Sequence, residues 1–258
     1  MLLKKFLTII LLLALTGVGS TIPSNVTPNS QPINLGNIIG NLTNTCQVAL
    51  LNIITSPEFL KCVPVNALLP LLPMLSEIEY IKKNPKELLK YLDPIDQFSN
   101  GIRSAPKCSD NFVQSTINAI EDKCLTNLTS NNPIAELIYD AAVFYSPLRD
   151  SMSFKNNNVF CIHETANITL NLPDSPFNIT GNTIIDAIAV AEPGQVCTQC
   201  NKDIINTFGN FLKNNTLALQ VLAQAGINQT RIDTMKIGVA VKCGINFEDG
   251  AVSNNLSQ

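Results

Sequence analysis

Eight cysteines and one histidine are the residues of this 258-residue chain that could support chemistry. Cys197 and Cys200 form a Cys-x-x-Cys motif, which exchanges disulfides where a helix N-terminus lowers a thiol pKa. That redox interpretation requires a βαβ context, which the surrounding sequence lacks. The favoured interpretation is therefore structural, with each of the two cysteines bonded to a distant cysteine. A zinc site would need a second such pair or histidine ligands, and only His163 exists.

Hydrolytic chemistry has little support in the remaining residues. A histidine-dependent hydrolase would have to use His163, close to Cys161, and no Gly-x-Ser-x-Gly elbow supplies a serine nucleophile. A glycosidase needs only two carboxylates, but the chain has no tryptophan and only four tyrosines to form a sugar platform. We therefore expect a protein that is not an enzyme, with no cofactor and no metal.

The composition excludes further classes. Hydrophobic residues make up 45% of the chain and charged residues 14%, against roughly 25% charged in an average protein. A chain this apolar is not intrinsically disordered. With 17 Lys and Arg residues and a net charge of −3, it is not expected to bind nucleic acid, whose affinity comes mainly from neutralised phosphates.

The N-terminus predicts export. Lys4 and Lys5 precede an apolar run, Phe6–Val18, and small residues follow up to Ser20. This pattern is typical of a cleaved signal peptide over residues 1–20, because a membrane-spanning helix needs about 20 apolar residues. No later run is long enough to span a bilayer, and the polar end of the chain lacks the hydrophobic tail of a lipid anchor. We expect a secreted, extracellular protein.

Eight Asn-x-Ser/Thr acceptor sequences support the same destination. Chance alone would give roughly four in a chain of this composition. Any glycosylated asparagine must face solvent. The predicted glycosylation sites are Asn25, Asn41, Asn127, Asn167, Asn178, Asn214, Asn228 and Asn255.

Helical patterns dominate from residue 42 onward. Ser56-Pro57, Asn84-Pro85 and Asn132-Pro133 each place a capping residue before a proline at the first helical position, and Glu87 could close a capping box with Asn84. Helical spacing also predicts apolar faces along Val113, Ile117, Ile120 and Cys124; along Ile134, Leu137, Ile138, Ala141, Ala142 and Tyr145; along Cys197, Cys200, Ile204, Phe208 and Phe211; and along Ile232, Met235, Val239 and Cys243.

The predicted fold is mainly α, a disulfide-stapled helical domain with a small β-hairpin near 158–172. The candidate strands are Asn158–His163 and Ala166–Leu172. The predicted organisation is a signal peptide at 1–20, a flexible leader at 21–40, a single helical disulfide-rich domain at 41–250 and a polar tail at 251–258.

An even number of cysteines is expected of disulfides formed in an oxidising compartment. They are Cys46, Cys62, Cys108, Cys124, Cys161, Cys197, Cys200 and Cys243. If 108–124 is one helix, its end cysteines lie about 24 Å apart and cannot pair, because disulfide Cα atoms lie within about 7 Å. The nested solution, Cys46–Cys124 with Cys62–Cys108, is one hypothesis among the roughly 105 connectivities that eight cysteines allow.

The ordered cysteine pattern resembles a family of fungal secreted, cysteine-rich proteins of unknown function. The resemblance implies an extracellular or cell-surface location and no catalytic residues. It is carried by Cys46, Phe59–Cys62, Cys108, Cys124, Tyr145–Leu148, Cys161, Cys197–Cys200 and Cys243-Gly244.

Three functional hypotheses follow. The first is a structural or interaction role outside the cell, with cell-wall or other extracellular components as partners. The second is a carrier of an apolar small molecule such as a lipid or sterol, with the aliphatic, proline-interrupted segment Val63–Leu75 forming a pocket wall. The third is a thiol oxidoreductase that uses Cys197 and Cys200.

Overall fold

The computed structural model describes residues 42–64, 84–130, 132–173, 190–224 and 226–253, together with residues 66, 69–71, 74, 77, 80, 81 and 188. The predicted signal peptide, the predicted leader and the end of the predicted tail lie outside the described residues, as do the acceptor asparagines Asn25, Asn41, Asn178 and Asn255.

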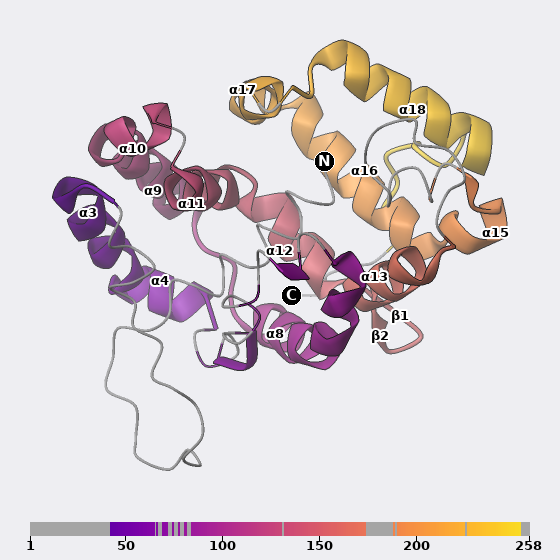
Figure 1. Ribbon diagram of the computed structural model, residues 1–258, viewed down its shortest axis with the longest axis horizontal. Helices are drawn as coiled ribbons and strands as arrows, with labels where there is room; N and C mark the ends of the chain where they lie inside the picture. The colour runs from indigo at the N-terminus through magenta and orange to yellow at the C-terminus, as the bar shows by residue number, and fades with distance from the viewer. Residues whose placement is uncertain are drawn as a thin grey trace. The chain divides into compact units, whose positions relative to one another are not determined.

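The described chain is mainly α-helical, with one two-stranded antiparallel sheet, as predicted (Figure 1). Its contacts divide it into two compact units, whereas the sequence predicted one domain over 41–250. The N-terminal unit contains the described residues up to Ile78 and Ser104–Tyr145. The C-terminal unit contains Glu79–Arg103 and the residues from Ser146 onward.

The N-terminal unit is a small group of helices around α9. Helix α9 packs against α3 and α11, and α10 follows directly from it. The elements are α3 (Asn44–Ile54), α4 (Pro57–Cys62), a 3-10 turn η2 (Leu69–Leu71), α9 (Asp110–Lys123), α10 (Leu125–Thr129) and α11 (Pro133–Val143).

Local capping fixes where these helices begin. The hydroxyl of Ser56 accepts the Phe59 N–H and precedes Pro57, as the sequence predicts. The hydroxyl of Ser109 caps α9 in the same way. Asn132 Oδ1 accepts the Ala135 N–H at 3.2 Å before α11, which confirms the predicted start at Pro133.

The C-terminal unit contains the remaining elements. They are η3 (Pro85–Tyr91), α8 (Leu92–Ser104), most of α12 (Tyr145–Ser153), β1 (Lys155–Asn156), β2 (Val159–Phe160), α13 (Cys161–Asn171), α15 (Pro193–Val196), α16 (Gln199–Lys213), α17 (Thr216–Gln224) and α18 (Gln229–Cys243). The predicted capping box at Asn84 is wrong, because Asn84 makes no cap to the following turn and its Nδ2 instead donates to the Tyr80 carbonyl.

A small β-hairpin is present, as predicted, but it occupies residues 155–160. Of the first candidate strand, Asn158–His163, only Val159 and Phe160 lie in a strand, and Cys161 already begins α13. Lys155 pairs with Phe160, and the turn residues Asn157 and Asn158 have φ of 49° and 67°, which is the geometry of a two-residue hairpin turn. The second candidate strand, Ala166–Leu172, is wrong, since those residues up to Asn171 belong to α13. Apolar residues there satisfy a period of two and a helical period equally well.

Helix α16 buries a polar face. The predicted face of Ile204, Phe208 and Phe211 is only half-buried, whereas Asp203 and Asn206 are almost fully buried. The cause is the C-terminal segment 246–253, which lies along α16 and presents backbone groups that require polar partners. Asn206 Nδ2 donates to the Ala251 carbonyl at 2.9 Å, and Asp203 Oδ1 accepts the Ser253 N–H at 3.0 Å.

The predicted apolar face of α18 is only partly buried. Ile232 is buried, Val239 and Cys243 are half-buried, and Met235 is 42% exposed. A single apolar anchor is enough here because the Cys197–Cys243 disulfide and the bond from Lys242 Nζ to the Ala191 carbonyl also hold the helix.

Candidate functional site

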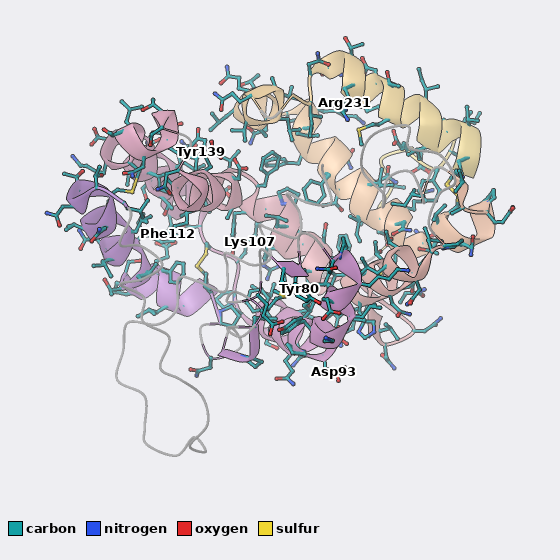
Figure 2. All side chains as sticks on the ribbon, viewed as in Figure 1. Tyr80, Asp93, Lys107, Phe112, Tyr139 and Arg231 are labelled. Atoms are coloured by element: carbon teal, nitrogen blue, oxygen red, sulfur yellow. A yellow bond between two sulfur atoms is a disulfide. The ribbon has the colours of Figure 1, made fainter. Side chains whose placement is uncertain are left out.

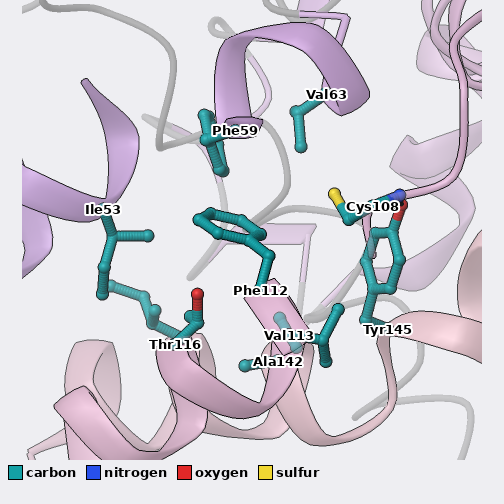
Figure 3. A pocket seen from close by; sticks show the side chains of 11 residues that line it. Ile53, Phe59, Val63, Cys108, Phe112, Val113, Thr116, Ala142 and Tyr145 are labelled. Carbon is teal, nitrogen blue, oxygen red and sulfur yellow. Dashed lines mark hydrogen bonds between the residues drawn. The ribbon is translucent and has the colours of Figure 1, made fainter. Parts of the chain in front are cut away.

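An apolar pocket in the N-terminal unit is the best candidate for a functional site. Helix α9 supplies one side of the pocket, and α3, α4 and α11 supply the others. Figure 3 shows Phe112 of α9 projecting toward Phe59 of α4. The lining residues are Ile53, Phe59, Val63, Cys108, Phe112, Val113, Thr116, Ile138, Ala141, Ala142 and Tyr145.

The pocket is small and partly open. Its volume is about 70 Å³, whereas sites that enclose a whole small-molecule ligand measure about 300–1,000 Å³. Phe112, Val113 and Ile138 are half-buried, so they form the accessible part of the wall. A cavity of this size fits one apolar group and does not enclose a lipid or a sterol.

Covalent and polar links hold the rim of the pocket. The Cys62–Cys108 disulfide joins the end of α4 to the segment before α9, with a Cα–Cα distance of 5.0 Å. The Cys108 N–H donates to the Tyr145 hydroxyl at 2.9 Å. Glu58 accepts from the backbone and side chain of Ser109, at the start of α9. These links fix the positions of the apolar side chains before any ligand binds, which lowers the entropic cost of binding.

One hydroxyl among the lining residues has no partner within the described part of the chain. Thr116 Oγ1 is buried and forms no hydrogen bond within the described residues. No charged side chain lines the cavity. The described lining residues can therefore exclude water from an apolar group.

A hydrogen bond joins the two helices beside the pocket. The Tyr139 hydroxyl of α11 donates to Glu121 Oε1 of α9 at 2.6 Å. Burial and then this bond to a carboxylate raise the pKa of Tyr139 well above its ordinary value. The phenol therefore stays neutral and keeps donating throughout the physiological range.

All eight cysteines form disulfides. Cys46–Cys124 and Cys62–Cys108 are nested, which confirms that hypothesis, and both lie in the N-terminal unit. The other pairs are Cys161–Cys200 and Cys197–Cys243 (Figure 2). The two cysteines of the Cys-x-x-Cys motif are thus bonded to different distant cysteines. This arrangement contradicts the thiol oxidoreductase hypothesis, which needs both thiols to alternate with a disulfide between them.

His163 lies outside the pocket, in the C-terminal unit. Its Nδ1 is 2.8 Å from Asp96 Oδ2, so it joins α13 to α8. Asp96 Oδ1 is buried without a hydrogen-bond partner in the described part of the chain. Among the described residues, no group of three or more His, Cys, Asp or Glu is placed to hold a metal ion.

Four predicted glycosylation sites lie within the described residues. Asn167, Asn214 and Asn228 are exposed, whereas Asn127 is only 5% exposed. None of the described helices is long and apolar enough to span a bilayer.

Sequence patterns identified half of the pocket. The predicted faces included Val113 of α9, three residues of α11 (Ile138, Ala141 and Ala142) and Tyr145, which begins α12. Val63, the first residue of the segment predicted to form a pocket wall, also lines the pocket. They missed Phe59, Phe112 and Thr116. Phe112 immediately precedes the predicted α9 face, and an aromatic residue at the edge of an apolar stripe is the signal that could have indicated an open cavity.

Comparisons with known proteins give one family. The family model described as "Domain of unknown function (DUF7729)" matches residues 31–252, which covers both units. No curated protein matches the chain. No solved structure matches it either.

Proposed function

The chain belongs to the family described as a domain of unknown function (DUF7729), and we propose that it is a secreted, N-glycosylated binding protein without catalytic activity. Its N-terminal unit binds an apolar group of an extracellular partner. The observation that carries the proposal is the pocket. Its rim is fixed, it is partly open, and its lining is almost wholly apolar, so it can bind an apolar group but supplies no groups for catalysis.

Three features of the chain support the extracellular part of the proposal. The N-terminal signal pattern is one, and the excess of acceptor sequences is another. The third is the complete pairing of eight cysteines, which is typical of oxidising compartments. The fungal source implied by the cysteine pattern stays a prediction.

The occupant is the end of an alkyl chain or an aliphatic side chain of the partner. A cavity of about 70 Å³ is smaller than the engineered one of about 150 Å³ that binds benzene. The accessible wall is apolar, so affinity comes from removing apolar surface from water. The carrier hypothesis is disfavoured for this pocket, because most of a lipid or sterol would stay outside it.

Pocket-filling substitutions test the proposal. Val113→Phe adds a ring at the half-buried wall, and Val48→Phe adds the same ring on α3, where Val48 is 49% exposed and does not line the cavity. Binding of xenon and n-octanol to the secreted, disulfide-bonded protein is measured by NMR.

We expect saturable binding by the unmodified protein and by Val48→Phe, and loss of most of that binding in Val113→Phe. Equal binding by all three proteins, or no saturable binding by any, would refute a role for the pocket. Recovery of the protein from cells with residues 1–20 still attached would refute secretion.

A further inference from the structure

Two acceptor sequences for glycosylation meet in the N-terminal unit. Thr43 is the third residue of the Asn41 acceptor sequence, and Asn127 is the first residue of another. The Thr43 hydroxyl donates to Asn127 Oδ1 at 2.8 Å, and the Thr43 N–H donates to the same oxygen at 3.2 Å. One amide side chain therefore accepts two hydrogen bonds across 84 residues of sequence.

This contact lies beside a disulfide. Cys46 bonds Cys124 at a Cα–Cα distance of 4.6 Å, and the Thr45 hydroxyl donates to the Lys123 carbonyl at 3.3 Å. Thr43 is the N-cap residue of α3, but its side chain makes no cap to that helix because it is directed to Asn127. The Asn127 side chain thus fixes the start of α3 against α10.

Burial decides whether such a side chain can carry a sugar. A glycan is bulky and must extend into solvent from the amide nitrogen. Asn127 is only 5% exposed, so its amide has no path for a glycan while Thr43 remains bound to it.

The exposed sites differ in this respect. Asn228 is the N-cap of α18, where its Oδ1 accepts the Arg231 N–H at 3.0 Å, but unlike Asn127 the residue is exposed. Asn167 Oδ1 accepts from Asn171 Nδ2 at 3.0 Å on an exposed face of α13. Asn214 is exposed at the end of α16.

We propose that Asn127 is not a glycosylation site in the folded protein but a latch that binds Thr43, and that, of the four acceptor asparagines within the described residues, Asn167, Asn214 and Asn228 carry glycans. The second half rests on the proposed secretion and glycosylation. The latch itself does not, because it follows from burial and hydrogen bonds alone.

Paired substitutions separate the two halves. Thr129→Ala destroys the Asn127 acceptor sequence without touching the asparagine, and Thr230→Ala does the same for Asn228. Thr129 and Thr230 are both exposed helical residues, so each variant is the matched control of the other. The full chain is expressed in a secretory host, and the intact mass is measured before and after enzymatic removal of N-glycans.

Thr129→Ala should leave the glycan mass unchanged, and Thr230→Ala should lower it by one glycan. Loss of a glycan in Thr129→Ala, from protein in which the Cys46–Cys124 disulfide is intact, would overturn the proposal. Absence of glycan from every variant would refute the proposed glycosylation instead.

A second measurement tests the latch whatever the glycan result. In protein from a non-glycosylating, disulfide-forming host, Asn127→Ala removes both hydrogen bonds to Thr43 and Thr43→Val removes the one from the hydroxyl. Each single variant should lower the thermal midpoint by a few degrees, and the double variant should fall little below Asn127→Ala, because the two changes share one interaction. Asn167→Ala, at an exposed site, should leave the midpoint unchanged. Fully additive losses, or no loss in either single variant, would refute the latch.

Discussion

Removal of the outer disulfide, by Cys46→Ser with Cys124→Ser, should cost the N-terminal unit about 3.7 kcal/mol of unfolding free energy. The magnitude follows from the nesting. The outer bond spans 78 residues, but the inner Cys62–Cys108 bond already closes 46 of them. The outer bond therefore restricts about 32 residues of the unfolded chain, and the loop-entropy relation then gives the stated value.

Guanidinium unfolding without reductant measures this loss, and alkylation followed by mass spectrometry counts the free thiols. The variant should contain no free thiol, because Cys62 and Cys108 remain bonded to each other. The mispaired control, Cys46→Ser with Cys62→Ser, should expose two thiols at Cys108 and Cys124. Two free thiols in the first variant would refute the nested pairing. A stability loss below about 1 kcal/mol would refute the loop argument.

Three further predictions concern polar groups. Thr116→Val should raise the unfolding free energy by about 1–2 kcal/mol, because it removes a buried hydroxyl without a partner. A lower unfolding free energy in a guanidinium melt would show that the hydroxyl is paired. Tyr139→Phe should cost about 1 kcal/mol in the same assay, through the lost bond to Glu121, and unchanged stability would contradict this. Lys202 holds the pKa of Asp249 below its ordinary value of 3.8. The ion pair should therefore stabilise the protein above that pH, and its contribution to stability should be lost as the pH falls below it. The protection of the 246–253 amides against exchange, taken relative to the intrinsic rate at each pH, should therefore fall in acid in the unmodified protein. Asp249→Asn should abolish most of that dependence, and an equal loss of protection in both proteins would refute the prediction.

Local rules explain why the starts of several helices could be predicted. A cap such as Ser56 or Asn132 bonds an N–H only three residues along the chain, so residue types at fixed spacing are sufficient. Helix ends follow equally local rules. Gly226 and Gly244 follow α17 and α18 with φ of 75° and 91°, a region that favours glycine. The apolar residues of 166–172 fit both the period of a strand and the period of a helix, so the sequence could not decide between the two there.

Faces and pockets depend on what packs against a helix. Asp203 and Asn206 are buried because the backbone of 246–253 lies on α16 and needs their hydrogen bonds. Nothing within α16 itself indicates that partner. Phe112 lines a cavity for a similar reason, since the space beside it is set by how α4 and α11 meet α9.

The sequence by itself determined the helical class, the helix starts, the even cysteine set and the absence of a familiar catalytic motif, because each depends on composition or on residues within one turn of each other. The length of α9 also required its end cysteines to pair elsewhere. Only the tertiary structure decided that Cys197 and Cys200 belong to different disulfides, that Asn127 is buried against Thr43, and that an apolar cavity remains at α9. Each of these outcomes depends on distances between segments far apart in the chain, which only packing sets.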